Sequence, residues 1–184
     1  MLISVARVHM EDKYRWAEDS LNIIHHESND QEHDEESSPG TIHGTDVQKL
    51  KQAIWSYLTA YQQIRFYYGK WQKENGIINK SNKYIDKWKI NFLTSEQTIV
   101  WDLLNRFRTV DTHDEPILPG ISVQLKILGI NNKSLMINGK RVGIRRKTVE
   151  ISVDGRYYEL VFLATTGLIC MRIFIDTIDQ VSLL

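Results

Sequence analysis

The sequence predicts an α+β protein in which an N-terminal bundle of about four helices is followed by a C-terminal antiparallel β-meander or small barrel. In the first part of the chain, apolar residues recur at steps of three and four, and beyond Pro119 the period drops to two. All five tryptophans lie in the first part, which indicates one helical core there. The dipeptides Asn138-Gly139 and Asp154-Gly155 are typical of β-hairpin turns. We therefore expect a helical domain over residues 1–115 and a β domain over residues 116–184.

Composition and charge exclude several classes of protein. With 184 residues and 42% hydrophobic content, the chain is able to bury a core. Its 23 basic and 23 acidic residues cancel, so any site for a polyanion must be local. The single cysteine, Cys170, excludes an internal disulfide. Neither a signal peptide nor a run of roughly 18 to 20 apolar residues is recognised, so we expect a cytoplasmic protein with no membrane partner.

Residues 2–24 predict a first amphipathic helix, with Met10 to Asp12 as the point where it would break. An acidic loop over residues 27–44 follows, because its first part holds acids without a single Lys or Arg. Histidines surround these acids: His25, His26, His33 and His43. Imidazole and carboxylate are both metal ligands, but the spacing matches no zinc signature. A polar loop is therefore the preferred interpretation, and no metal or cofactor is predicted.

A long helix is expected after Thr45-Asp46, which can cap it. Its apolar stripe is wide and rich in aromatic residues: Val47, Leu50, Ile54, Tyr57, Leu58, Tyr61, Ile64, Tyr68 and Trp71. Such a stripe ordinarily packs against other helices, and stacking of nucleic-acid bases is the alternative use. A shorter helix is expected over residues 81–92. The basic residues between Arg65 and Lys89 form either a local positive patch or a solvated helical face.

The next helix starts at a capping-box signature, Thr94-Ser95-Glu96-Gln97. In this motif the threonine side chain accepts a hydrogen bond from the backbone three residues on, while the glutamine side chain reaches back. The apolar residues expected along one face are Ile99, Leu103, Phe107 and Val110. The far end of this helix, within residues 103–114, carries the only compact arginine and histidine constellation in the sequence.

About six short strands are expected beyond Pro119-Gly120, where turn dipeptides appear at intervals. The strand ranges are 121–128, 134–137, 140–144, 148–153, 156–163 and 168–175. Thr165-Thr166-Gly167 is expected to form a further turn. Val149 and Ile151 alternate with Glu150, so one face of the sheet should be buried and the other solvated.

A basic cluster lies around the second hairpin and consists of Arg141, Arg145, Arg146 and Lys147. Such a cluster can bind the phosphates of a nucleic acid. Charged residues also protect edge strands from aggregation, and the two interpretations are equally well supported.

The arginines before His113 differ in helical phase. On an ideal helix, Arg106 and His113 fall on nearly the same face, whereas Arg108 and His113 diverge by roughly 140°. Arg108 converges with His113 only if the last turn tightens, bulges or unwinds. An imidazole can transfer a proton near neutral pH, and a guanidinium can stabilise charge on a phosphate. These are the needs of metal-independent RNA cleavage by the 2′-hydroxyl, with Asp111 as the candidate to orient the histidine.

The segment Arg108-Thr109-Val110-Asp111-Thr112-His113 resembles the motif of the HEPN superfamily, an arginine followed after four to six residues by a histidine. The resemblance covers the N-terminal helical part only, and here Thr109 stands where that family usually has Asn, Asp or His. It implies a helical bundle, often dimeric, and an RNase of a toxin, phage-defence or RNA-processing system. Arg108 and His113 would then be the catalytic pair, with Arg106 as the alternative first position.

The leading functional expectation is a HEPN-like metal-independent endoribonuclease or RNA-binding protein of a defence or toxin system. RNA would be its partner, and the helical bundle would form a homodimer. The alternative is a non-enzymatic interaction or regulatory module that binds a protein partner through the aromatic helical face or the β domain. A third hypothesis is metal-dependent hydrolysis by the loop of histidines and acids.

Overall fold

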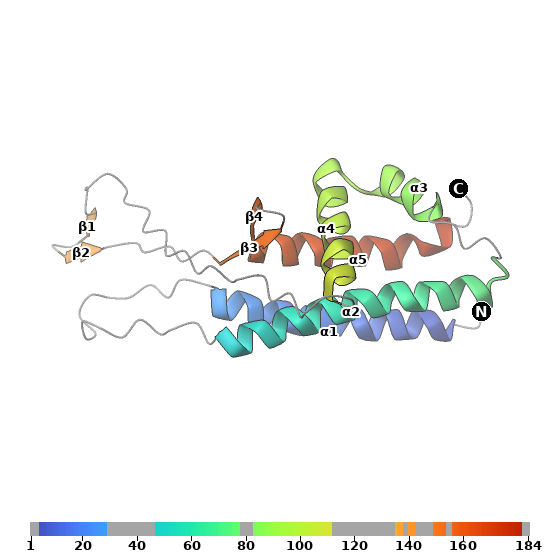
Figure 1. Cartoon of the computed structure of the whole chain (residues 1–184), viewed down its shortest axis with the longest axis horizontal. Helices are drawn as coiled ribbons and strands as arrows, with labels where there is room; N and C mark the ends of the chain where they lie inside the picture. The colour runs from blue at the N-terminus through green and yellow to red at the C-terminus, as the bar shows by residue number, and fades with distance from the viewer. Residues whose placement is uncertain are drawn as a thin grey trace.

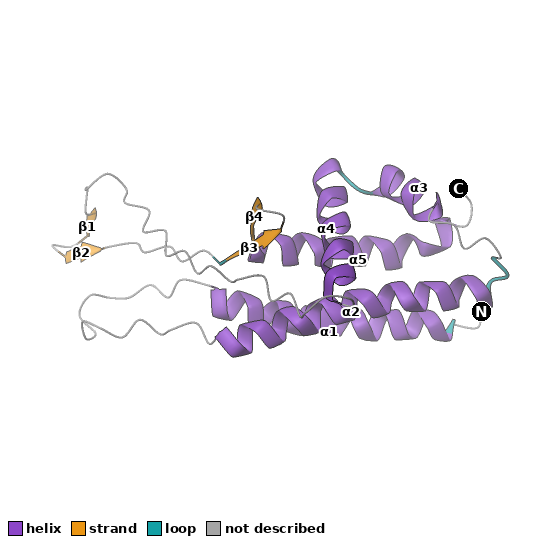
Figure 2. Ribbon diagram, viewed as in Figure 1, coloured by secondary structure: helices purple, strands orange, loops and turns teal. Residues whose placement is uncertain are grey.

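The structure, a computed structural model, describes residues 4–28, 47–77, 83–111, 135–137, 140–142, 149–153 and 156–181. Its helices are α1 (Val5–Ser28), α2 (Val47–Glu74), α3 (Lys83–Phe92), α4 (Ser95–Asp111) and α5 (Leu160–Val181). Its strands are β1 (Leu135–Ile137), β2 (Lys140–Val142), β3 (Glu150–Val153) and β4 (Arg156–Glu159). Figure 2 shows that helix dominates this part of the chain.

Helices α1 and α2 form an antiparallel pair (Figure 1). Both ends of the pair are tied, since the Ser4 hydroxyl donates to Glu74 at 2.5 Å and the Lys49 ammonium lies 2.9 Å from Glu27. Helix α5 runs along this pair, α4 crosses α5, and α3 packs against the later part of α5 (Figure 1). The packing of α5 thus joins all the other helices.

Helix α1 is continuous, and the expected break near Met10 does not occur. The side chain of Met10 is fully buried, which fixes this turn against the core. The buried apolar residues of α1 are Ala6, Met10, Ala17, Leu21 and Ile24. The apolar spacing of residues 2–24 also includes Val5 and Val8, but Val5 is 65% exposed and Val8 is 46% exposed, so these two residues do not face the core.

The predicted apolar stripe of α2 is confirmed, because Leu50, Ile54, Tyr57, Tyr61, Ile64, Tyr68 and Trp71 are buried. The centre of the core is aromatic. The ring of Trp101 lies 4.8 Å from Trp88 and 5.3 Å from Phe174, and Trp88 lies 4.9 Å from Phe174. These residues belong to α3, α4 and α5, so the aromatic contacts join two consecutive helices to the C-terminal helix, which is far from them in sequence.

The predicted capping box at the start of α4 is confirmed. The Thr94 backbone N–H donates to the Gln97 side-chain oxygen at 2.9 Å, and the Gln97 N–H donates to the Thr94 hydroxyl at 3.2 Å. The inward face of α4 is displaced from the expected one, because the buried residues are Val100, Trp101, Leu104 and Phe107. Ile99 is 58% exposed, since the much larger apolar surface of Trp101 occupies the core.

The expected fold class, a bundle followed by a meander or barrel, is wrong: the described chain is a helical protein with two small hairpins. Helix α5 occupies the residues expected to form the last strand and much of the one before it. The pairs β1–β2 and β3–β4 are separate two-stranded antiparallel sheets, which confirms only the two predicted hairpins. The expected strand 121–128 and the expected boundary after residue 115 lie outside the described residues.

Packing explains why the α5 segment is helical. Phe174, Ile175 and Ile178 are completely buried, and burial of this kind overrides the weak strand preference of β-branched residues. Gly167, expected in a turn, lies inside α5 at its closest approach to α2 and α4. Leu160–Gln180 is long and apolar enough to cross a membrane by length and composition, which the sequence interpretation did not recognise, and half of it is buried within the fold.

Candidate functional site

The arginine and histidine motif begins in the last turns of α4. Arg106 and Arg108 both lie within the helix, and Asp111 is its final residue. His113 lies outside the described residues, as do the side chains of Arg108 and Asp111. The structure therefore places the first half of the motif on a regular helix, and convergence with His113 stays a prediction.

The two arginines occupy different sides of α4. Positions 106 and 108 are two residues apart, which places them on nearly opposite sides of the helix. Position 106 falls on the side of the helix opposite to the buried Trp101 and Leu104, and the Arg106 side chain is exposed. The two candidates for the first motif position are thus not interchangeable, and the exposed Arg106 lies on the side of α4 away from the core.

The basic cluster expected to bind phosphates is described only at its start. Arg141 lies in β2, opposite Met136 of β1. Arg145, Arg146 and Lys147 lie outside the described residues, so their role in nucleic-acid binding stays a prediction.

Helix α2 carries a second candidate surface on the side opposite to its buried stripe. The residues that follow each other there at steps of three and four are Lys51, Trp55, Thr59, Gln62, Phe66, Lys70 and Lys73, which we call the α2 outer stripe. None of them is buried. Trp55 is 56% exposed and Phe66 is 60% exposed, which is unusual for such large apolar rings.

One lysine of the α2 outer stripe lies against aromatic rings. The Lys70 ammonium lies 4.9 Å from the ring centre of Phe66 and 5.3 Å from that of Tyr67. His9 of α1 stacks on Tyr67 at 4.7 Å, so one face of this tyrosine is covered. These cation–π contacts hold positive charge beside flat apolar surfaces.

The predicted basic patch between Arg65 and Lys89 is partly neutralised. Burial alone would lower the pKa of Lys89, but hydrogen bonds to Asp102 and Asp86 outweigh it and raise the pKa. The Lys89 ammonium lies 3.0 Å from Asp102 and 3.1 Å from Asp86, so this charge joins α3 to α4. Lys70 and Lys73 of the patch belong instead to the α2 outer stripe.

An ion-pair network joins α1 to α5. Arg172 donates two hydrogen bonds of 2.8 Å to the carboxylate of Glu11, and two more, of 2.9 Å and 2.5 Å, to the carboxylate of Asp176. The hydrogen bond from Arg172 lowers the pKa of Glu11, although burial opposes this shift. The guanidinium also lies 5.0 Å from the ring centre of Tyr14. All these charges are compensated, which is typical of a structural network.

The remaining candidates for chemistry are the histidines and acids considered as metal ligands, and the thiol of Cys170. In the described part of the chain, no group of three or more His, Cys, Asp or Glu side chains is placed to hold a metal ion. His25 lies 3.3 Å from the Thr165 hydroxyl, and His33 and His43 lie outside the described residues. Burial raises the pKa of the Cys170 thiol to about 12, which makes it a poor nucleophile at neutral pH.

Comparison with known proteins gives no match: neither a protein-family model, nor a curated protein, nor a solved structure matches this chain. The resemblance of residues 108–113 to the HEPN motif is therefore a hypothesis drawn from the sequence.

The α2 outer stripe was missed by the sequence interpretation, which considered only the apolar stripe of the helix. The signal was nevertheless present. Trp55 and Phe66 are eleven residues apart, which places them on one face of a helix, and neither fits the positions of the buried stripe. A large ring on the polar side of an amphipathic helix indicates an exposed aromatic surface.

Proposed function

We propose that the protein is a HEPN-like, metal-independent endoribonuclease. In this reaction a base removes the proton of an RNA 2′-hydroxyl, whose oxygen attacks the neighbouring phosphorus. The 5′-oxygen leaves with a proton, and the products carry a 2′,3′-cyclic phosphate and a 5′-hydroxyl. His113 would transfer a proton and an arginine would stabilise the charge on the phosphate.

The single observation that supports this proposal is the anchoring of α4. Trp101 and Leu104 fix the helix in the aromatic core, so the arginines at its end extend from a rigid element. Arg106 is the better placed of the two, because position 106 faces away from the core and is seven residues before His113. The proposal includes a cytoplasmic location, and it treats the apolar helix α5 as a helix of the core and not as a membrane span.

Cleavage of a fluorescently labelled single-stranded RNA tests the proposal. We expect activity in excess EDTA, no cleavage of the 2′-O-methyl analogue, and loss of cleavage in His113→Ala with a melting temperature within a few degrees of the parent. Arg106→Ala should reduce the rate by about 10²-fold or more. His26→Ala is the matched control, because this exposed histidine lies at the end of α1. Unchanged cleavage by His113→Ala, or a requirement for a divalent ion, would refute the proposal.

A further inference from the structure

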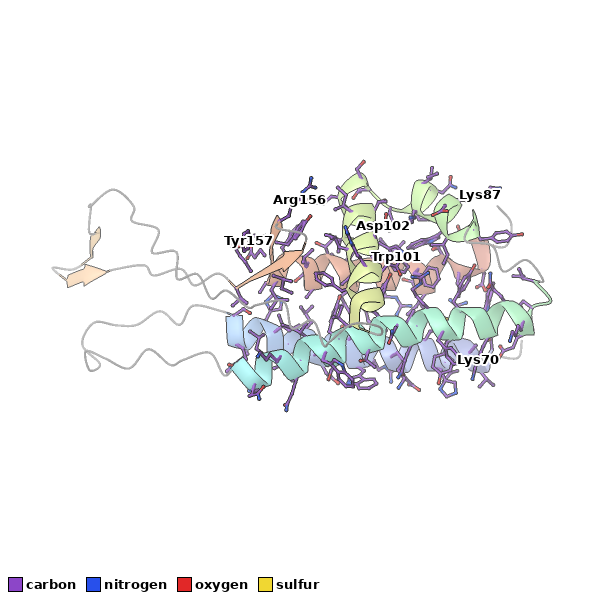
Figure 3. All side chains as sticks on the ribbon, viewed as in Figure 1. Lys70, Lys87, Trp101, Asp102, Arg156 and Tyr157 are labelled. Carbon is purple, nitrogen blue, oxygen red and sulfur yellow. The ribbon has the colours of Figure 1, made fainter. Side chains whose placement is uncertain are left out.

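The α2 outer stripe lies on the side of α2 opposite to the contact between α2 and α4. On the opposite side of α2, the Tyr61 hydroxyl donates to the Trp101 carbonyl oxygen of α4 at 3.3 Å. Figure 3 shows Lys70 on α2, apart from Trp101 and Asp102 on α4. A ligand on this stripe would therefore bind whether or not the α4 motif is catalytic.

We infer that the α2 outer stripe binds single-stranded RNA. Bases would stack on the rings of Trp55 and Phe66, and the ammonium groups of Lys51, Lys70 and Lys73 would contact phosphates. Proteins that bind single strands without sequence preference combine these same two elements, aromatic platforms and a basic track along the backbone.

The charge of α2 selects an anionic ligand. The helix contains no acidic residue from Val47 to Lys73, and its only acid is Glu74 at the end. The basic track from Lys51 to Lys73 extends over about 33 Å at the rise of an α-helix. On the neighbouring helix α1, exposed Asp12 and Asp19 would repel phosphates. The strand would therefore follow α2 and not cross the helix pair.

The aromatic rings select unpaired bases. A duplex presents mainly phosphates to a convex surface, whereas a single strand offers the faces of its bases for stacking. Lys70 lies over the ring of Phe66, yet the residue remains 60% exposed, so it retains area on which a base can stack. Thr59 and Gln62 lie between Trp55 and Phe66 and offer hydrogen bonds to base edges, which lipid chains cannot accept.

Fluorescence anisotropy of a labelled oligouridylate measures this binding. The probe is about 12 nucleotides long and carries 2′-O-methyl riboses, so it binds but cannot be cleaved by 2′-hydroxyl attack. Binding is thus measured independently of the proposed ribonuclease activity. We expect the affinity to fall as salt is raised, because phosphate contacts release counterions.

Substitution of the exposed rings tests the assigned surface. Trp55→Ala and Phe66→Ala should each weaken binding by roughly 5- to 150-fold, as expected for the loss of one stacked base. Ile99→Ala is the matched control, since Ile99 is an equally exposed apolar residue on α4. The double change of Lys70 and Lys73 to Gln should reduce the slope of log affinity against log salt by about 0.7 for each lost phosphate contact. Circular dichroism should show that all four variants keep their helical content.

Four results would overturn the inference. These are no binding of the oligonucleotide at low salt, unchanged affinity in Trp55→Ala and Phe66→Ala, equal affinity for duplex RNA, and equal losses in Ile99→Ala. Anionic phosphatidylserine vesicles serve as the competing ligand. If Trp55→Ala and Phe66→Ala abolish vesicle binding but leave oligonucleotide binding intact, the stripe is a membrane-contacting surface and not an RNA site.

Discussion

The Tyr57 hydroxyl of α2 donates a 2.7 Å hydrogen bond to the Ala164 carbonyl oxygen of α5. Both residues are buried, so this bond fixes the distance between two core helices. The approach is close because Gly167, one turn further along α5, has no side chain. A Cβ atom built on Gly167 would lie 2.7 Å from both the Tyr57 oxygen and Cδ1 of Leu104. Gly167 thus permits the close approach of α5 to both α2 and α4.

We predict that Gly167→Ala destabilises the protein despite the higher helix propensity of alanine. The added methyl group must displace Tyr57 or Leu104, and overpacking of this kind costs about 1–3 kcal/mol. Urea denaturation followed by circular dichroism measures the change in the free energy of unfolding.

Gly69→Ala in α2 is the matched control for this substitution. A Cβ at Gly69 meets no atom within 4 Å, so alanine should raise the free energy of unfolding by about 0.5–1 kcal/mol. If Gly167→Ala were as stable as Gly69→Ala, the close contact between α5 and its neighbours would be incorrect.

The sequence predicted the first four helices better than the last one. Helices α1 to α4 are amphipathic, and the spacing of their apolar residues reveals the helical period. In α5, apolar and β-branched residues lie on most sides of the helix, so the period is hidden and a buried strand fits equally well. Gly167 strengthened the wrong interpretation. Glycine at this position allows a close tertiary contact between helices, which the sequence does not show, and it does not form a turn.

The features of the candidate sites also differ in how well the sequence could predict them. The position of Arg106 and Arg108 on one late helix could be predicted, because α4 has a capping box and a regular period. The side of α4 that faces the core depends on where Trp101 packs, which is a property of the whole bundle. The exposed rings of Trp55 and Phe66 were predictable from helical phase alone.

We predict that Glu11→Gln lowers stability at neutral pH but not in acid. The pKa of Glu11 is lowered in the folded chain by its hydrogen bonds to Arg172, so its contribution is present above the ordinary value of 4.5 and is lost as the pH falls through the folded value. The side chains of Glu11 and Arg172 are 35% and 33% exposed, so solvent screens the pair and the cost at pH 7 should be about 1 kcal/mol or less.

Urea unfolding of the parent and of Glu11→Gln at pH 7 and at about pH 3 measures this difference. Asp12→Asn on the next, exposed position of α1 is the control, and it should change stability by no more than about 0.5 kcal/mol at either pH. A stability difference for Glu11→Gln that grows in acid would contradict the assigned role of the ion pair.

We predict that the protein loses stability above about pH 9, through Cys170 before other groups. In the unfolded chain this thiol ionises near its ordinary pKa of 9.0, whereas burial in the folded chain raises the pKa to about 12. The unfolded state therefore releases the proton first, and each unit of pH between these values costs at most about 1.4 kcal/mol. Cys170→Ala should show a smaller loss between pH 8 and pH 10 in urea unfolding, whereas Tyr157→Phe at an exposed position of β4 should follow the parent. An identical decline in Cys170→Ala and the parent would show that the thiol is not protected in the core.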